Sequence, residues 1–596
     1  MQPELFYKER INHLQQSLTA LLYKKAQLGW ARFLAITLLV GAIYFLLPVG
    51  LLYAIIAGII LLAAFIRLVY ADSNNKAAIQ HTKHLIQTNK DEVDALAGNY
   101  HQFEDGGEYI PQNHFYANDI DILGKASLFQ YINRTNSDMG AATLAEWLLQ
   151  PATEDSIMER QAAIKELSNN TNWQQELQAT GKEKKIKKQT QQRLRDWLAE
   201  ETEFTKHPYW QALKYIVPAI MIAVILLNAF SFISDPIRNY FLLASAILAF
   251  VVAKKVMSVY LQVSKMVDEL DVMADSILVI EKATFNAPLL QQWQSVFIHE
   301  KGTASFELKE LKQILARFDY RLNPVIFIPL AIVLQWDLQQ VIALEKWKKR
   351  NQQNIHQWFD TLGKLEAISS LATIHFNHPN WCFPVLQKEH FSITGTAIGH
   401  PLINANKRVN NFINISHKGE LMLITGSNMA GKSTYLRSIG INTALAMAGS
   451  VVCATSFSTS PVQLMTSMRI ADNLEENTST FYAELKKLKG IIDKVNNNEK
   501  VFILLDEILR GTNSLDRHTG SKALIQQLIK HKAAGIIATH DIELAKLKEE
   551  YPDNILNYYF DVQVSNDELY FDYRLKPGVC GSLNASILMK KIGIEL

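Results

Sequence analysis

A glycine-rich loop between a short apolar run and a helical segment constrains this chain more than any other feature. Gly426, four further residues and then Gly431-Lys432-Ser433 make the G-x-x-x-x-G-K-[ST] pattern of a phosphate-binding loop. The run 421–424 before it is typical of a buried strand, and the segment 435–447 after it has a helical composition. Backbone N–H groups of such a loop surround phosphates, and the helix N-terminus adds a partial positive charge. The pattern therefore predicts an α/β P-loop domain.

The chemistry of the loop side chains assigns their roles. Lys432 is expected to reach the β- and γ-phosphates, and the Ser433 hydroxyl is expected to bind Mg²⁺. ATP and Mg²⁺ are therefore the predicted ligands. The residues expected to contact the nucleotide along this loop are Gly426, Ser427, Asn428, Met429, Ala430, Gly431, Lys432, Ser433 and Thr434.

Two carboxylates follow a second apolar run, Val501–Leu505. Open α/β sheets bind ligands beyond the carboxyl ends of their strands, so both side chains are expected near the phosphates. Asp506 is predicted to hold Mg²⁺ together with Ser433, directly or through water. Glu507 is predicted to position or deprotonate the attacking water.

A third apolar run, Gly535–Thr539, ends at His540. A histidine at that strand end can hydrogen-bond the γ-phosphate or the water. The predicted catalytic residues are Lys432, Glu507 and His540.

Hydroxyl-bearing residues precede another helical segment. Ser479 and Thr480 offer hydroxyl and backbone N–H groups at a helix start, which can contact phosphate. The alternative is an ordinary Ser/Thr cap at the N-terminus of a helix.

Two apolar regions predict membrane-spanning helices. Phe33–Ile66 contains no charged residue and is interrupted by Pro48-Val49-Gly50. A helix needs about 20 residues to cross a bilayer, so this stretch predicts a hairpin of two spans. A second pair, Tyr215–Ile233 and Tyr240–Val252, predicts another transmembrane hairpin. A hairpin buried in a soluble core is the alternative for the first pair, and a re-entrant or core-buried pair is the alternative for the second.

Basic residues flank both hairpins on one side. The outer turns hold few of them: Pro48–Gly50 has none, and the second turn has Arg238. The positive-inside rule then predicts a multi-pass protein of the cell (inner) membrane, with both termini and the middle segment in the cytoplasm. The flanking basic residues are Lys24, Lys25, Arg32, Arg67, Lys76, Lys206, Lys214, Lys254 and Lys255.

Charge and cysteine content narrow the possible ligands. The net charge is only +2, so any nucleic-acid surface would have to be a local patch. Lys182–Arg195 is rich in basic residues, and it is either a phosphate-contacting patch or a solvated helix near anionic headgroups. The 3 cysteines fit no metal-ligand spacing and suit a reducing compartment.

Taken together, these motifs resemble the MutS family of DNA mismatch-repair ATPases. Thr425–Thr434 is similar to that family's T-G-P-N-M-G-G-K-S-T, and Leu504–Asp516 is similar to M-D-E-I-G-R-G-T-S-T-x-D. Residues 479–484 match S-T-F-x-x-E, and 538–540 match A-T-H. Upstream, 115–167 looks like the family's core (lever) domain, with Leu-Gly-Lys-Ala-Ser-Leu-Phe, Asn-Arg-Thr and Leu-Leu-Gln-Pro segments.

The resemblance implies a homodimer in which ATP lies between Lys432 of one subunit and Ser479 of the other. It makes double-stranded DNA a candidate partner, and no small-molecule substrate beyond ATP is expected. Phe412 either stacks on the adenine or is a core residue. Ser427 and Ala430 replace a proline and a glycine of the family's loop. Nothing ahead of the core match looks like the family's mismatch-reading domain, so the resemblance gives little support for mismatch recognition by this chain.

The expected architecture is an ABC-class, MutS-type α/β P-loop NTPase domain at the C-terminal end, a mostly α-helical core and lever domain, and two transmembrane helical hairpins. The expected boundaries are a cytoplasmic N-terminal helix at 1–29, hairpins at 30–70 and 211–256, core segments at 71–210 and 257–390, and the ATPase domain at 391–596.

The expected function is that of a membrane-anchored MutS-like ATPase that hydrolyses ATP in a composite homodimer site and acts on DNA. One alternative is a membrane scaffold that uses ATP as a conformational switch without binding DNA. The other is an ABC-type transporter.

Overall fold

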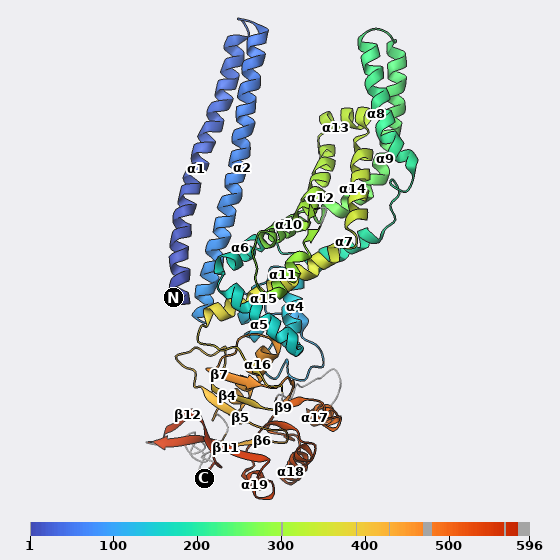
Figure 1. Cartoon of the computed structure of the whole chain (residues 1–596). Helices are drawn as coiled ribbons and strands as arrows, with labels where there is room; N and C mark the ends of the chain where they lie inside the picture. The colour runs from blue at the N-terminus through green and yellow to red at the C-terminus, as the bar shows by residue number, and fades with distance from the viewer. Residues whose placement is uncertain are drawn as a thin grey trace.

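The computed structural model describes residues 2–299, 302–388, 390–427, 430–468, 480–565 and 568–581. A helical body occupies the middle of the molecule, two helical arms project from one side of it, and an α/β domain lies on the opposite side (Figure 1). Both arms point away from the α/β domain.

The first arm is an antiparallel pair of long helices, α1 (Pro3–Leu46) and α2 (Leu51–Leu96). The chain turns at 47–50, where the sequence has its Pro-Val-Gly interruption. Only the far parts of both helices come from the uncharged stretch. The polar segments on either side continue the same helices into the body. Helix α2 therefore runs without a break past residue 70, where the first hairpin was expected to end.

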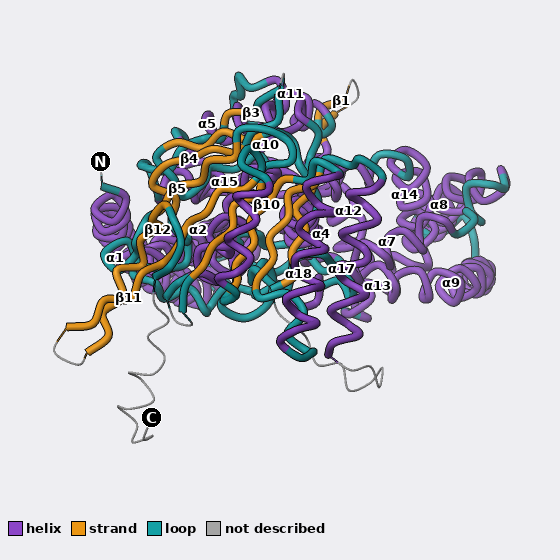
Figure 2. The backbone as a smooth tube through the Cα atoms, turned by 90° about the horizontal axis from the view of Figure 1, so that it is seen from below, coloured by secondary structure: helices purple, strands orange, loops and turns teal. Residues whose placement is uncertain are grey.

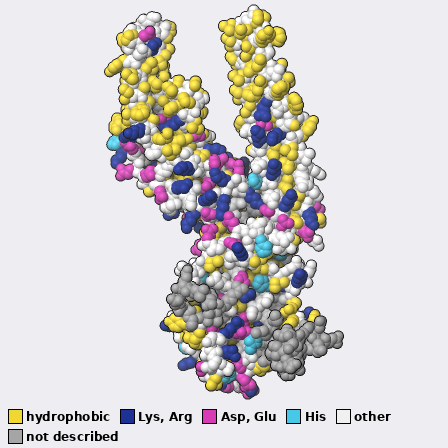
Figure 3. All heavy atoms as spheres, turned by 180° about the vertical axis from the view of Figure 1, so that it is seen from behind, with side chains coloured by type: hydrophobic (Ala, Val, Ile, Leu, Met, Phe, Trp, Pro, Cys, Tyr) yellow, Lys and Arg dark blue, Asp and Glu magenta, His cyan; other side chains and the backbone are white. Residues whose placement is uncertain are grey.

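The second arm contains α8 (Pro208–Ala229), α9 (Asp235–Ser264) and the shorter α13 (Pro324–Leu334), which packs against both. Among the described residues, α1, α2, α8 and α9 are long and apolar enough to cross a membrane, and the bent pair that begins with α13 would make a fifth span. The most apolar windows of the four helices are only 6 to 17% buried. Apolar side chains predominate on the far parts of both arms, and most Lys and Arg side chains lie lower down (Figure 3).

The body is built around α15 (Ile355–Asn377), most of which is buried. Helix α4 (Asp138–Leu149) packs closely on it, because a Cβ atom on Gly140 would lie only 2.2 Å from the Glu366 carboxylate. The other helices of the body are α3 (Leu128–Ile132), α5 (Glu154–Ser168), α6 (Thr171–Gly181), α7 (Lys188–Ala199), α10 (Val267–Glu281), α11 (Pro288–Ser295), α12 (Ala304–Phe318) and α14 (Trp336–Asn351), with 3₁₀ turns at Gly107–Tyr109 and Asp319–Leu322 and a small hairpin of β1 (Ile298–His299) and β2 (Gly302–Thr303).

The α/β domain contains a six-stranded sheet in the order β12-β11-β6-β10-β9-β8. All neighbours are parallel except β11 and β12, which form an antiparallel hairpin. The strands are β6 (Leu421–Thr425), β8 (Gln463–Ser467), β9 (Val501–Asp506), β10 (Ala534–Thr539), β11 (Ile555–Ser565) and β12 (Glu568–Pro577).

A smaller sheet has the order β3-β7-β4-β5, formed by β3 (Val385–Leu386), β4 (Ile393–Ile398), β5 (Asn411–Ile415) and β7 (Ser456–Thr459). In the view from below, the strands of the two sheets lie close together with helices around them (Figure 2). The helices of the domain are α16 (Lys432–Ala448), α17 (Thr480–Asn496), α18 (Ser514–Lys530) and α19 (Leu547–Glu550), and a 3₁₀ turn lies at Ile542–Lys546.

Helix α16 lies between the main sheet and the body. A Cβ atom on its Gly440 would touch Ile120 of the body at 3.0 Å and Leu504 of β9 at 3.1 Å. One apolar cluster therefore runs from the body through α16 to the sheet, whereas a second cluster fills the other face under α17 and α18. Because the body and the sheet share a core, a displacement of α16 would disturb the packing of both.

Candidate nucleotide-binding site

The topology of the main sheet brings three predicted strand ends together. Strand β10 lies between β6 and β9, and all three run in the same direction. Thr539 pairs with Thr425, and Ala538 pairs with Asp506, so the strands end at the same level. The glycine-rich loop, the two carboxylates and His540 therefore meet at one edge of the sheet, as expected for a ligand site in a parallel sheet.

The backbone of the loop requires glycine at both of its ends. Gly426 has φ 150° and Gly431 has φ 103°, values that residues with side chains rarely adopt. A Cβ atom on Gly426 would also lie 2.9 Å from the carbonyl oxygen of Phe560. The loop can therefore pass close to β11 and turn into α16 at Lys432.

Lys432 is buried at the start of α16, and its ammonium group faces the inside of the loop. It donates hydrogen bonds to the carbonyl oxygens of Gly426 and Ser427, both at 2.9 Å. Burial lowers the pKa of Lys432, while Glu507 and Asp506 oppose that shift. A cation held at the mouth of a loop of N–H groups is suited to a phosphate chain.

The arrangement of Asp506 and Ser433 fits a divalent cation. Asp506 is largely buried, and burial raises its pKa against the effect of a hydrogen bond from the Ser433 hydroxyl. Its Oδ1 atom is buried and has no hydrogen-bond partner among the described residues. A carboxylate oxygen without a partner beside a hydroxyl is the donor set that a P-loop presents to Mg²⁺.

Glu507 lies between two basic side chains. The Nε2 atom of His540 donates to one of its carboxylate oxygens, and the Nε atom of Arg510 lies 2.8 Å from the other. The hydrogen bond from His540 is the main cause that lowers the pKa of Glu507. Its carboxylate is therefore held ionised, as a general base must be. Glu507 directly follows β9, and its backbone lies in the left-handed region, with φ 50°.

Two residues near Glu507 received no role from the sequence. One is Arg510, which stands three positions after the glutamate. The other is Glu484 of α17, whose Oε1 atom accepts the backbone N–H of Leu509 at 2.5 Å. Glu484 thereby fastens α17 to the loop that carries Glu507. Both residues belong to the segments that resemble MutS sequences, and this was the one signal that could have singled them out.

Three predicted nucleotide contacts, Asn428, Met429 and Ser479, lie outside the described residues, so their roles stay predictions. Phe412 lies on β5, and its ring packs edge-on against Tyr558 with 5.6 Å between ring centroids. This contact is that of a core residue, and stacking of Phe412 on adenine also stays a prediction.

Two joints connect the candidate site to the body. At the first, Arg160 of α5 donates to the carbonyl oxygen of Ala448 at 3.0 Å, so it caps the C-terminus of α16. Its guanidinium also stacks over the Trp147 ring at 3.8 Å. At the second, Asp119 of the body accepts hydrogen bonds from Thr466 at 2.6 Å and from Lys487 of α17 at 2.7 Å. The helices on both sides of the candidate site are thus tied to the body.

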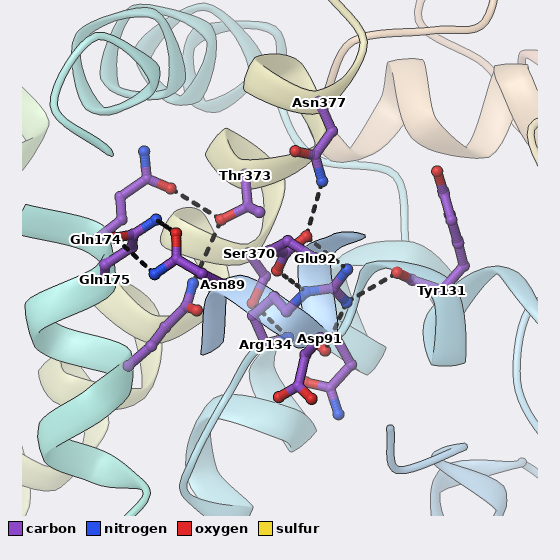
Figure 4. A network of polar contacts seen from close by, with 12 residues as sticks. Asn89, Asp91, Glu92, Tyr131, Arg134, Gln174, Gln175, Ser370, Thr373 and Asn377 are labelled. Atoms are coloured by element: carbon purple, nitrogen blue, oxygen red, sulfur yellow. Dashed lines mark hydrogen bonds and ion pairs between the residues drawn. The ribbon is translucent and has the colours of Figure 1, made fainter. Parts of the chain in front are cut away.

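The base of the first arm is tied to the body by a buried polar network (Figure 4). Arg134 forms an ion pair with Glu92 of α2, and its Nη2 atom lies 3.1 Å from the Oε2 atom of the carboxylate. The same oxygen accepts a hydrogen bond from the side-chain amide of Asn377 in α15 at 2.8 Å. The Tyr7 hydroxyl of α1 donates a hydrogen bond to the amide oxygen of Asn377 at 2.7 Å. The network therefore joins both helices of the arm to the C-terminal end of α15.

The basic segment Lys182–Arg195 is partly neutralised within the fold. Lys182 pairs with Asp91 at 2.5 Å, and Lys184 pairs with Asp268 at 2.7 Å. Lys185 contacts two carboxylates, Glu104 and Asp138, each at 2.7 Å. These three lysines are therefore engaged with acidic neighbours, which weakens the case for a phosphate-contacting patch at this end of the segment.

Two segments of the chain match family models. Residues 110–206 match MutS domain III, and residues 422–589 match MutS domain V. The first covers much of the body ahead of α8, and the second covers the main sheet and the candidate site. The four long apolar helices lie outside both segments.

Proteins that share these segments include eukaryotic and bacterial sequences. The human MutS protein homolog 4 is 35% identical over 196 residues, which cover 31% of this chain and 20% of that protein. The mouse MutS protein homolog 4 is 37% identical over the same length, with the same coverage. The DNA mismatch repair protein MutS of Finegoldia magna is 35% identical over 186 residues, which cover 30% of this chain and 21% of that protein. The chain spans about a fifth of the length of the curated relatives that it matches.

Proposed function

Because this chain is a member of the MutS family, we propose that it is a membrane-anchored ATPase that hydrolyses ATP in a composite site formed by two copies and acts on DNA. The observation that carries the proposal is the meeting of Lys432, Asp506, Glu507 and His540 at one edge of the parallel sheet.

Each side chain of the site has one task in this proposal. Lys432 binds the phosphate chain, and Ser433 and Asp506 hold Mg²⁺, which neutralises phosphate charge when it is bound. Glu507 accepts the proton of the attacking water, because His540 and Arg510 keep its carboxylate ionised. The contact between His540 and Glu507 also fixes the direction in which the carboxylate points.

Two copies complete the site through α17. The predicted contact, Ser479, immediately precedes α17, and Glu484 of the same helix is bonded to the loop after Glu507. Nucleotide bound between two copies would therefore act on α17 and, through Lys487 and Asp119, on the body. The homodimer remains a proposal based on the resemblance.

The two arms support the proposed anchoring in the cell (inner) membrane. They point in the same direction, away from the α/β domain, and expose apolar side chains along their far parts (Figures 1 and 3). Tyr44 near the end of the first arm is 74% exposed, and Phe232 at the turn of the second is 76% exposed. Such surfaces are unusual in water and ordinary in lipid. With the orientation that the positive-inside rule predicts, the candidate site would lie in the cytoplasm, where ATP is present.

The ATPase proposal is tested with the full-length protein in detergent. We expect Glu507→Gln to bind ATP with near wild-type affinity and to hydrolyse it about 100-fold more slowly, because the general base is lost. Lys432→Ala should weaken ATP binding itself. Glu543→Gln, an exposed carboxylate of the same domain, serves as the matched control. Wild-type rates in both site variants would refute the proposal.

The ion pairs of Lys182, Lys184 and Lys185 favour a second candidate function without DNA. In that case the protein is a membrane scaffold that uses ATP as a conformational switch and binds no nucleic acid. Binding of homoduplex, mismatched and branched DNA, measured across salt concentrations with and without ATP, separates the two candidates. If Lys187 and Lys188 contact phosphates, replacing both with alanine should reduce the salt slope by about 2. No salt-dependent binding to any of the three DNAs would favour the scaffold.

A further inference from the structure

A third apolar element in the second arm has no counterpart among the predicted spans. Helix α13 contains no charged residue, and Ala331 is its one buried residue. Val325 is 84% exposed, and Leu322 just before the helix is 79% exposed. No other described element covers this surface, which continues the exposed apolar surface of α8 and α9 against which α13 packs.

Hydrogen bonds place the end of α13 at the depth of the apolar stretch of α9. The Ser245 hydroxyl donates to the carbonyl oxygen of Ile332, and Gln335 donates to the Ser245 carbonyl oxygen at 3.0 Å. Ser245 lies within 240–252, the uncharged stretch of α9, well before Lys254. If α9 crosses a bilayer, this contact lies inside it, where paired polar groups avoid a large penalty for lost hydrogen bonds.

The two ends of the α13 segment are clamped together at its base. Arg321 before the helix and Asp337 after it form a two-pronged ion pair with both contacts at 2.8 Å. Beside it, the Tyr320 and Trp336 rings stack with 5.7 Å between centroids. The chain bends by 78° between α13 and α14, and α14 then runs back toward the body (Figure 1). Aromatic rings and arginines are the residues typical of the headgroup level.

We propose that α13 is a re-entrant membrane helix that enters the bilayer from the cytoplasmic side beside α8 and α9 and returns to that side. Its partner is the acyl-chain region of the lipid, with the Arg321–Asp337 clamp near the headgroups. The lipid is favoured over a second copy of the chain because the exposed face is continuous with the apolar surface of the arm and offers no charged group for pairing. The inference rests on the proposed membrane anchoring.

The test uses the full-length protein in phospholipid vesicles, with an environment-sensitive fluorophore attached to one introduced cysteine. Val325→Cys probes α13, Tyr44→Cys probes the first arm, and Leu515→Cys probes exposed α18 in the α/β domain. Leu322→Cys is a second probe of the α13 segment, and the wild-type protein treated with the same reagent gives the background from native cysteines. Lipids that carry a nitroxide on the acyl chain then quench only fluorophores in contact with lipid.

We expect blue-shifted emission and quenching by about twofold at positions 325 and 44, and neither effect at 515. Quenching at 44 without quenching at 325 and 322 would overturn the inference and leave the anchoring intact. A blue shift at 325 without quenching would mean that protein covers α13, and it would also overturn the inference. Absence of quenching at all positions, including 44, would refute the membrane anchoring together with the inference.

Discussion

The carboxylate of Asp119 accepts a hydrogen bond from the ammonium of Lys487 at 2.7 Å, across the joint between the helical body and α17. Asp119 is almost completely buried, and it also accepts the Thr466 hydroxyl and the backbone N–H of Met468. One side chain therefore connects the body with β8, with the segment after it and with the helix that begins next to the predicted partner contact. A change at the nucleotide site can reach the body through this residue.

Asp119→Ala should lower the free energy of unfolding by about 2 kcal/mol, because the partly buried ammonium of Lys487 and the backbone N–H of Met468 lose their acceptor. Thermal unfolding of the full-length protein in detergent measures the effect. Asp155→Ala, on the exposed face of α5, is the control and should change the free energy by less than about 0.5 kcal/mol. Equal melting temperatures for the two variants would show that the joint at Asp119 contributes little.

His540→Ala should move the acid limb of the ATPase pH profile to higher pH. The hydrogen bond from His540 lowers the pKa of Glu507, so its removal raises that pKa. Glu507 acts as a base only when ionised, and a higher pKa therefore requires a higher pH for half-maximal kcat. His417→Ala, an exposed histidine of the same domain, should leave the profile unchanged. A lower kcat with an unshifted acid limb would mean that His540 does not set the ionisation of Glu507.

Glu366 should make the protein less stable as the pH rises. Burial raises its pKa from 4.5 to about 7, although the Ser137 hydroxyl and N–H donate to its carboxylate. Between these two pH values the folded state binds one more proton than the unfolded state, so the free energy of unfolding falls with increasing pH. Above about pH 7 this contribution levels off, after a total loss of about 3 kcal/mol.

Glu366→Gln removes the titrating group and keeps an acceptor for Ser137. The difference in melting temperature between wild-type and variant, measured at pH 5.5 and again at pH 8, isolates this group from all others. We expect the wild-type protein to lose stability relative to the variant over this interval. A constant difference would show that Glu366 titrates below it.

Breaking the Glu92–Arg134 pair from one side should be more damaging than replacing both partners. Glu92→Leu alone leaves the buried guanidinium of Arg134 without its main partner and should lower the free energy of unfolding by about 3 kcal/mol or more. The double variant Glu92→Leu/Arg134→Met should recover part of this loss, because no buried charge remains. A double-mutant cycle by thermal unfolding measures the coupling, and additive effects would argue that the pair is not coupled.

Local patterns were sufficient to find the parts of the site that lie at the ends of strands. The loop 426–433, the carboxylates of Asp506 and Glu507, and His540 each follow a short apolar run, and parallel strands bring such ends to one edge. The apolar helix pairs could also be predicted, because length and absence of charge are properties of a single segment. Helix α13 could not, since eleven apolar residues are too few to cross a bilayer and are equally typical of a buried core.

The sequence by itself determined the nucleotide-binding loop, the apolar strands that carry its partners and the two apolar helix pairs, because these depend on neighbours along the chain. Only the tertiary structure decided which charges meet. It paired Glu507 with His540, Asp119 with Lys487, and Glu92 with Arg134. It also engaged Lys182, Lys184 and Lys185 with carboxylates from distant segments. Partners brought together by packing can be tens or hundreds of residues apart, and no periodicity in the chain records their distance.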